Sequence, residues 1–391
     1  MQKLSLFSLP AVVTYGVSLL VGSLYALVVP TLSVFLANEL QVRPFLIGSF
    51  FVSMSLTAIV YGQSIALWSD RIADRRKLIF VGMVFGGLAC FGFAWLRSYP
   101  LVMLTGLTLF SLSFSAAAQI VALSREFADQ HLEARHNRIF NAIVRACVAL
   151  AWMAGPPIGF ALLKYTSFQQ HYATTALLYF AVAIVALLLL PQTRKRELGD
   201  SDEVPVNHRS VMFTAVAAFS LLYGANQCYL ISLPLFLEQN LGIESYKAGW
   251  LFGTAAGLEI PVMIFAGWLG GRFNLLPLIR IGAVAAVILN LGVWHATALW
   301  QLFALQLFNA VFIGFVAGLG MSWFQDRLPG RMGTASALYL NCMNLGNVLG
   351  SVFLALFAEL YSYRELFAVN LVGCVLALGL FYLVGKREQT V

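Results

Sequence analysis

Charged residues are scarce in this chain. Only 10% of the 391 residues are Asp, Glu, Lys or Arg, whereas 60% belong to the hydrophobic set. A soluble protein of ordinary composition carries about a quarter charged residues. A chain with so few charges cannot cover a surface that faces water, so a soluble enzyme or soluble binding module is excluded. The composition therefore predicts a membrane protein.

Cysteine and catalytic motifs are scarce as well. The five cysteines are odd in number and scattered through apolar segments, which indicates neither a disulfide framework nor a metal site. No phosphate-binding loop of the G-x-x-x-x-G-K type occurs. No Ser/His pair or group of metal ligands lies deep within an apolar run. We expect no cofactor, no nucleotide-driven pump and no enzyme, with an intramembrane hydrolase the least favoured class.

Long apolar runs fill most of the chain. Each approaches the ~20 residues that a helix needs to cross a hydrocarbon core of ~30 Å. The first six are roughly 11–36, 45–67, 78–96, 100–123, 139–163 and 172–191. The second six are roughly 211–236, 248–270, 278–297, 300–325, 334–358 and 364–385. We predict an all-α membrane protein of twelve transmembrane helices in two six-helix bundles, 1–191 and 210–391, joined by a polar linker at 192–209.

The cations indicate the orientation. Lys and Arg near span ends are retained on the cytoplasmic side of a membrane. Most of the 24 Lys and Arg residues lie in the termini, the linker and the turns on that same side. Those on the opposite side are Arg43, Arg97, Lys164, Lys247 and Arg364. The linker and both termini are therefore predicted to be cytoplasmic, and the net charge of +7 reflects topology, so no nucleic-acid partner is expected.

The turn after the second predicted span is unusually charged. It reads DRIADRRK over 70–77, and the stretch that begins at Ala66 has a faint counterpart beginning at Gly267. Internal repeats of this kind are typical of secondary transporters. Two groups of six spans, a basic linker and this charged turn resemble the major facilitator superfamily over the whole chain. Ala73 stands where the superfamily pattern has glycine, which affects only the detail of the turn.

Four stretches resemble the bacterial sugar efflux transporters more specifically. They are SDRIADRRKLI at 69–79, ALSREFAD at 122–129, ALAWMAGPPIGFAL at 149–162 and AAGLEIPVM at 255–263. The resemblance implies a monomeric secondary transporter in a bacterial inner (plasma) membrane. It would export mono- or disaccharides, or glycoside-like compounds, by alternating access.

The charged turn is a candidate gate. Carboxylates and cations there can hold neighbouring helix ends together in one conformation and release them in another. We expect this role for Asp70, Arg71, Asp74 and Arg75, although charges at this place also set the topology.

A second candidate gating element is the Gly155-Pro156-Pro157 sequence in the fifth predicted span. Two successive prolines remove two amide donors and clash with the preceding turn, which predicts a bend that shapes the contact with the other half. Gly and Pro are also generally more frequent in membrane helices than in soluble ones.

One carboxylate, Glu259, lies far from every predicted span end. At ~1.5 Å per residue it is about 16 Å below Ala248, close to the membrane midplane. An ionised group at this depth costs from ~2.5 kcal/mol upward unless it is paired or hydrated, so a function is expected. If the halves pack as in the superfamily, Arg145 of the fifth span is its neighbour. Arg145 would favour the ionised form and apolar surroundings the protonated form, and a purely structural salt bridge is the alternative.

Amides and aromatic rings near this depth suit a sugar, because amides both donate to and accept from hydroxyls. The candidate substrate-binding residues are Tyr25, Gln119, Asn141, Arg145, Trp152, Tyr223, Asn226, Gln227, Glu259, Asn309, Asn341 and Asn344. Tyr223, Asn226 and Gln227 share one helix face through their i, i+3 and i+4 spacing. Hydrogen bonding between helices is the alternative use of such side chains.

Sugar export driven by proton antiport is therefore the function that the sequence predicts. The partners are a small sugar, protons and the lipid bilayer, with Glu259 and Arg145 as the proton-coupling groups. A multidrug or amphiphile proton antiporter of the same fold is the first alternative. A membrane sensor that does not transport is the second, although this chain lacks the soluble domain that such proteins normally carry.

Overall fold

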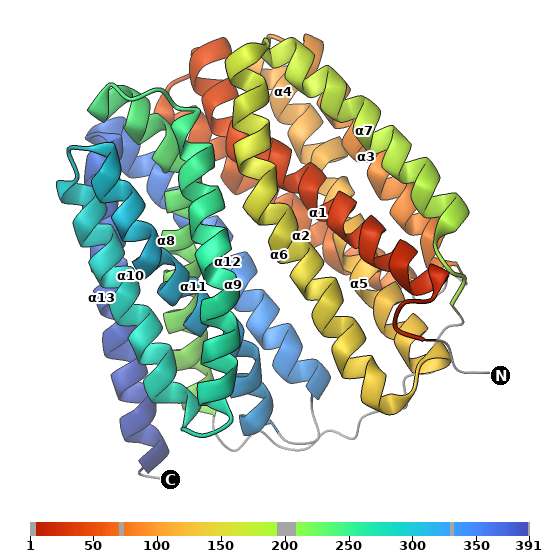
Figure 1. Cartoon of the computed structure of the whole chain (residues 1–391). Helices are drawn as coiled ribbons and strands as arrows, with labels where there is room; N and C mark the ends of the chain where they lie inside the picture. Colours follow the sequence, from red (N-terminus) through yellow and green to blue (C-terminus); the bar gives the residue numbers. More distant parts are fainter. Residues whose placement is uncertain (1–4, 70–73, 194–208, 329–331, 390–391) are drawn as a thin grey trace. The chain divides into compact units, whose positions relative to one another are not determined.

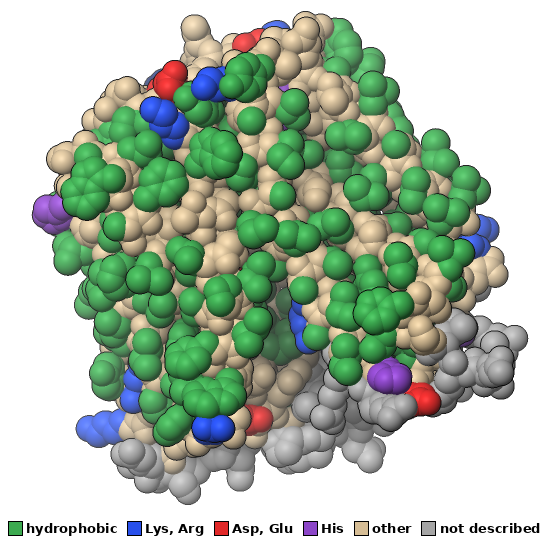
Figure 2. Space-filling view, in the orientation of Figure 1, with side chains coloured by type: hydrophobic (Ala, Val, Ile, Leu, Met, Phe, Trp, Pro, Cys, Tyr) green, Lys and Arg blue, Asp and Glu red, His purple; other side chains and the backbone are tan. Residues whose placement is uncertain are grey.

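The computed structural model describes residues 5–69, 74–193, 209–328 and 332–389. Twelve helices in these ranges are long and apolar enough to cross a membrane. The predicted all-α class and the number of spans are therefore confirmed. Hydrophobic side chains cover the broad middle of the face shown in Figure 2, and most charged side chains on that face lie towards the helix ends.

The first six spans are built from seven α-helices and two π-helical turns. They are α1 (Leu9–Val34) with η1 (Phe35–Glu39), α2 (Pro44–Ser69), α3 (Arg75–Trp95), α4 (Tyr99–Thr105) with η2 (Gly106–Phe110) and α5 (Ser111–His131), α6 (Ala134–Tyr165) and α7 (Phe168–Leu189). The second six spans are single helices. They are α8 (Arg209–Leu241), α9 (Lys247–Gly270), α10 (Leu275–His295), α11 (Leu299–Arg327), α12 (Met332–Leu360) and α13 (Tyr363–Gln389).

Contacts divide the chain into two compact units. The first comprises Met1–Val42 and Ser53–Leu198, and the second comprises Arg43–Val52 and Gly199–Val391. Within the first unit, α1 packs on α6 and α7, and α3 packs on α5 and α7 (Figure 1). Within the second, α8 packs on α12 and α13, while α11 packs on α9 and α10. The beginning of α2 thus groups with the helices of the second half.

Several helix ends have a local cause in the sequence. The Asp74 carboxylate caps α3 by accepting a hydrogen bond from the backbone N–H of Arg76 at 3.1 Å. A capping box begins α7, in which Ser167 and Gln170 exchange side-chain-to-backbone hydrogen bonds. After α8 the chain turns at Gly242, whose φ of +63° favours glycine. These caps satisfy backbone groups that a helix end leaves without partners.

Small residues let helices approach closely inside each unit. In the second unit, Gly224 of α8 faces Gly346 and Gly350 of α12, and a Cβ at Gly350 would collide with the carbonyl oxygen of Gly224. We call this contact the glycine seam. Large apolar side chains such as Phe213 and Ile264 are 75% and 70% exposed, as expected for surfaces that face lipid. All five cysteines are free.

The Gly155-Pro156-Pro157 sequence lies within α6, which continues as an α-helix through both prolines. Gly155 packs on Ala26 of α1, where a Cβ would collide with the Ala26 side chain. This glycine is thus required for helix packing inside the first unit. The gating role predicted for Gly155, Pro156 and Pro157 stays a prediction.

Candidate functional site

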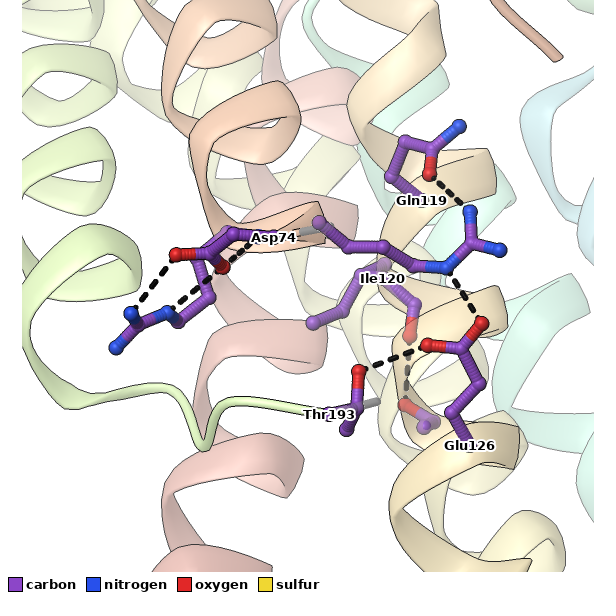
Figure 3. A network of polar contacts seen from close by, with 8 residues as sticks. Asp74, Gln119, Ile120, Glu126 and Thr193 are labelled. Carbon is purple, nitrogen blue, oxygen red and sulfur yellow. Dashed lines mark hydrogen bonds and ion pairs between the residues drawn. The ribbon is translucent and has the colours of Figure 1, made fainter. Parts of the chain in front are cut away.

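A polar network joins three segments of the first unit at the start of α3. The Arg75 guanidinium donates from Nε to Glu126 Oε1 at 2.8 Å and from Nη1 to Gln119 Oε1 at 2.7 Å (Figure 3). The Thr193 hydroxyl donates to the other Glu126 oxygen at 2.7 Å. The side chains of Arg75 and Glu126 are only 15% and 10% exposed. Arg75 therefore connects α3 to α5, and Glu126 connects α5 to the residues that follow α7.

Asp74 lies beside this network but bonds within its own turn. Its carboxylate accepts from Arg76 Nε at 2.9 Å and from Arg76 Nη2 at 2.8 Å, in addition to the backbone N–H that it caps. The hydrogen bonds from the Arg76 side chain hold the pKa of the Asp74 carboxyl below its ordinary value, against the opposing effect of burial. Of the four charged residues predicted to form a gate, Arg75 connects α3 to α5 through its hydrogen bonds. Asp74 stabilises the turn that begins α3. Asp70 and Arg71 lie outside the described residues.

The network also changes the interpretation of Gln119. This buried amide was expected to meet a sugar, yet its oxygen is bonded to Arg75. The sequence reasoning did not single out Glu126 or Thr193. Glu126 lies inside the ALSREFAD stretch that resembles sugar efflux transporters, which was an available signal, whereas nothing around Thr193 distinguished it.

A second polar cluster lies in the middle of the second unit. The phenols of Tyr223 on α8 and Tyr339 on α12 share a hydrogen bond of 2.6 Å, and Tyr339 also donates to the carbonyl of Ala317 on α11 at 3.1 Å. Glu259, midway along α9, lies close enough for its charge to act on both phenols. No ion pair joins Glu259 to any residue that the structure describes. Within the described part of the chain, an acidic side chain without an ion-pair partner thus lies near a pair of phenols.

Two amides extend this cluster along α8. Asn226 and Gln227 follow Tyr223 by three and four residues of the same helix, so all three share one face. Both amides are half-buried, and neither is hydrogen-bonded to a described residue. Their donors and acceptors are available to a ligand with hydroxyl groups. Tyr339 is a member of this cluster that the sequence reasoning missed.

Three other predicted substrate residues are occupied by contacts with helices. The Tyr25 hydroxyl donates to the carbonyl of Ser113, and its ring stacks on Phe114 at 5.0 Å between centroids. Asn141 donates to the carbonyl of Asn137 on its own helix at 2.8 Å. Asn309 is buried and donates to Gln306 at 3.2 Å. The interhelical alternative accounts for the contact of Tyr25, whereas Asn141 and Asn309 bond to residues of their own helices.

The remaining predicted residues make no hydrogen bond or ion pair with the described part of the chain. Arg145 and Asn341 are exposed, whereas Trp152 and Asn344 are half-buried. Arg145 belongs to the first unit and Glu259 to the second, so their predicted pairing stays a prediction.

Comparison with known proteins identifies the family. The sequence pattern of the Major Facilitator Superfamily matches residues 14–339 and 214–391. The chain belongs to the Major Facilitator Superfamily. It is 38% identical to Sugar efflux transporter A of Dickeya chrysanthemi over 90% of both chains. It is 36% identical to Sugar efflux transporter B of Salmonella typhimurium over 94% of both chains.

A solved structure confirms the superfamily's fold. The nucleoside transporter NupG superposes with a TM-score of 0.77 at 13% identity, over 96% of this chain and 99% of that one. At this identity the likeness concerns the fold alone. The predicted resemblance to sugar efflux transporters is confirmed by the relatives, which are named as transporters and not as enzymes.

Proposed function

We propose that this protein is a secondary active transporter that exports sugars or glycoside-like compounds. The observation that carries the proposal is the cluster around Glu259, with its phenol pair and two amides on α8. Relatives that share more than a third of their residues with this chain are named sugar efflux transporters. The cluster supplies the groups that such a substrate requires.

The chemistry of the cluster suits polyhydroxylated ligands. A carboxylate accepts hydrogen bonds from hydroxyls, and the amides of Asn226 and Gln227 both donate and accept. The phenol pair can exchange its mutual hydrogen bond for bonds to a ligand. Because these groups belong to three helices of one unit, a bound sugar would connect α8, α9 and α12.

We further propose that Glu259 carries the coupled proton and that Arg145 takes part in this step. A carboxylate inside a membrane span without an ion-pair partner changes its interactions strongly when it gains a proton, because its charge disappears. Protonation would allow the empty transporter to change conformation, and ionisation would favour contacts with substrate hydroxyls. Net export would then respond to a pH gradient.

Glu259→Gln tests the proposal, since glutamine keeps the shape and the hydrogen bonding but does not ionise. In proteoliposomes, counterflow of labelled sugars should persist within a few-fold, whereas net transport should lose its dependence on an imposed pH gradient. Glu244→Gln is the matched control, because Glu244 is 64% exposed and pairs with nearby Lys247 in the next turn of chain. An unchanged pH response in Glu259→Gln would refute the proton role.

The same assay separates sugars from the multidrug alternative. Unlabelled sugars should compete in counterflow, and lipophilic cations should not. The opposite pattern of competition would assign the protein to amphiphile export.

We also propose the topology and the domain division. The distribution of Lys and Arg supports an orientation with both termini cytoplasmic. A monomer in a bacterial inner membrane is proposed from the likeness to bacterial sugar efflux transporters. The proposed domains are bundles at 1–191 and 210–391 with the linker 192–209 between them. Asp70, Arg71, Asp74 and Arg75, with Gly155, Pro156 and Pro157, are proposed to act in gating.

A further inference from the structure

A pocket of ≈ 610 Å³ lies at one end of the second unit, where α10 begins and α11 and α13 end. Its lining contains the cations Arg280, Arg327 and Lys386 together with the carboxylates Asp326 and Glu388. None of the residues proposed to bind sugar or protons lines it. The pocket is therefore separate from the candidate site around Glu259.

Arg280 is held in a fixed orientation at the wall of this pocket. Its Nε and Nη2 atoms donate to the carbonyl of Phe381 at 3.3 and 2.9 Å, and its guanidinium lies 4.5 Å from the ring centroid of Tyr382. Gly385 makes room for the guanidinium, because a Cβ at this position would collide with Nη2. Three separate contacts thus fix a side chain that is otherwise long and flexible.

The charge of Arg280 is not neutralised by these contacts. Its bonds reach a neutral carbonyl, and no carboxylate in the described part of the chain bonds to it. Arg327, by contrast, is paired with Glu388 at 2.5 Å and lies 3.9 Å above the ring of Trp323. A guanidinium has five N–H donors. Two of those of Arg280 are used by Phe381, so the others remain available to an anion.

The pocket lies at the depth of lipid headgroups. Arg280 is about 8 Å along α10 from Leu275 at 1.5 Å per residue. The helices α11 and α13 both end their apolar runs here, at Arg327 and Glu388. Tyr382 is 58% exposed beside the pocket, and aromatic residues of this kind are enriched at membrane–water interfaces.

We propose that this pocket binds a phosphate ester through Arg280. A fixed guanidinium recognises phosphate oxygens with two parallel hydrogen bonds, which an ammonium group does not do. The phosphate of an anionic phospholipid headgroup is the source that the depth favours, and a soluble organic phosphate is the other source of the same chemistry. Binding would link the ends of α10 and α13 to the surrounding leaflet.

The test measures lipid binding to the purified full chain. Native mass spectrometry would count retained phosphatidylglycerol and phosphatidylcholine in the wild type, Arg280→Gln, Arg280→Lys and Arg272→Gln. Arg272 is the matched control because it lies in the turn before α10, stacks on Trp268 at 4.0 Å and does not line the pocket. A separate measurement adds glycerol 3-phosphate in detergent without lipid, to test whether a soluble phosphate ester binds the pocket.

The wild type should retain phosphatidylglycerol in preference to phosphatidylcholine. Arg280→Gln should weaken this binding about tenfold, as expected for the loss of charge-assisted hydrogen bonds. Arg280→Lys should bind phosphatidylglycerol more weakly than the wild type but more tightly than Arg280→Gln. Arg272→Gln should bind this lipid as the wild type does. Binding of glycerol 3-phosphate that Arg280→Gln weakens and Arg272→Gln does not would assign the site to soluble esters.

If Arg280→Gln and Arg272→Gln lost phosphatidylglycerol binding equally, the proposal would be refuted, since binding would then depend on the overall charge of the protein. Equal retention of the two lipids by the wild type, without binding of glycerol 3-phosphate, would also refute it. Thermal unfolding and sugar counterflow of each variant control for folding. Sugar export could fail as a proposal without affecting this result, because the lipid assay does not involve transport.

Discussion

The ion pair between Arg75 and Glu126 should contribute far more to stability than an ordinary surface pair. The two side chains are 15% and 10% exposed and their atoms lie 2.8 Å apart. Removing one partner of a buried pair leaves a charge without compensation, which costs ~3–5 kcal/mol. We expect about 3 kcal/mol for Glu126→Ala, the lower end of that range, because both side chains keep some contact with solvent and Gln119 still accepts from Arg75.

A double-mutant cycle isolates the pair. Arg75→Ala, Glu126→Ala and the double variant would be unfolded at equilibrium in mixed micelles of a mild detergent and dodecyl sulfate. The expected coupling free energy is about 2 kcal/mol, within the range for hydrogen bonds to charged groups. Loss of the Thr193 contact affects the Glu126 single variant and the double variant equally, so it cancels in the cycle.

The chain contains a matched control pair. Arg97 and Glu39 also form an Arg–Glu pair in the first unit, at 2.7 Å, but their side chains are 37% and 35% exposed. Exposed pairs typically couple by 0.2–1 kcal/mol. A coupling for Arg75 and Glu126 that equals that of Arg97 and Glu39 within about 0.5 kcal/mol would refute the reasoning that burial strengthens this contact.

Two further predictions concern packing and topology. Gly155→Ala should lower the free energy of unfolding by about 1–3 kcal/mol through overpacking against Ala26, whereas Gly16→Ala on α1, with nothing within 4 Å of its new Cβ, should change it by less than about 1 kcal/mol. Equal effects in the same unfolding assay would contradict the packing argument. A cysteine at exposed Gln192 should react with a membrane-impermeant maleimide only from the cytoplasmic side, and one at exposed Ser98 only from outside. The reverse labelling would overturn the proposed orientation.

The number of spans could be predicted because bilayer thickness sets the length of each apolar run. The ends of the helices could not be predicted in the same way. Hydropathy marks the part of a helix inside the membrane, whereas α6 begins at Ala134, several polar residues before its apolar run. The π-helical turns η1 and η2 left no recognisable pattern in the sequence.

The candidate site was predicted less completely than the fold. The isolated position of Glu259 and the common face of Tyr223, Asn226 and Gln227 are visible in one helix at a time. The partnership of Tyr223 with Tyr339 depends on how α8 and α12 pack, which one helix cannot indicate. Gln119 was assigned to substrate because its polarity is visible in the sequence, while its bond to Arg75 is not.

The glycine seam between α8 and α12 has a consequence for motion. Since the two backbones touch at Gly224 and Gly350 with no room for a side chain, neither helix can slide or rotate against the other without opening the contact. Backbone amides along the seam should therefore be among the slowest in this unit to exchange with deuterium. Tyr223 and Tyr339 are carried by these same helices. During a transport cycle, the two phenols should move together as part of one rigid body.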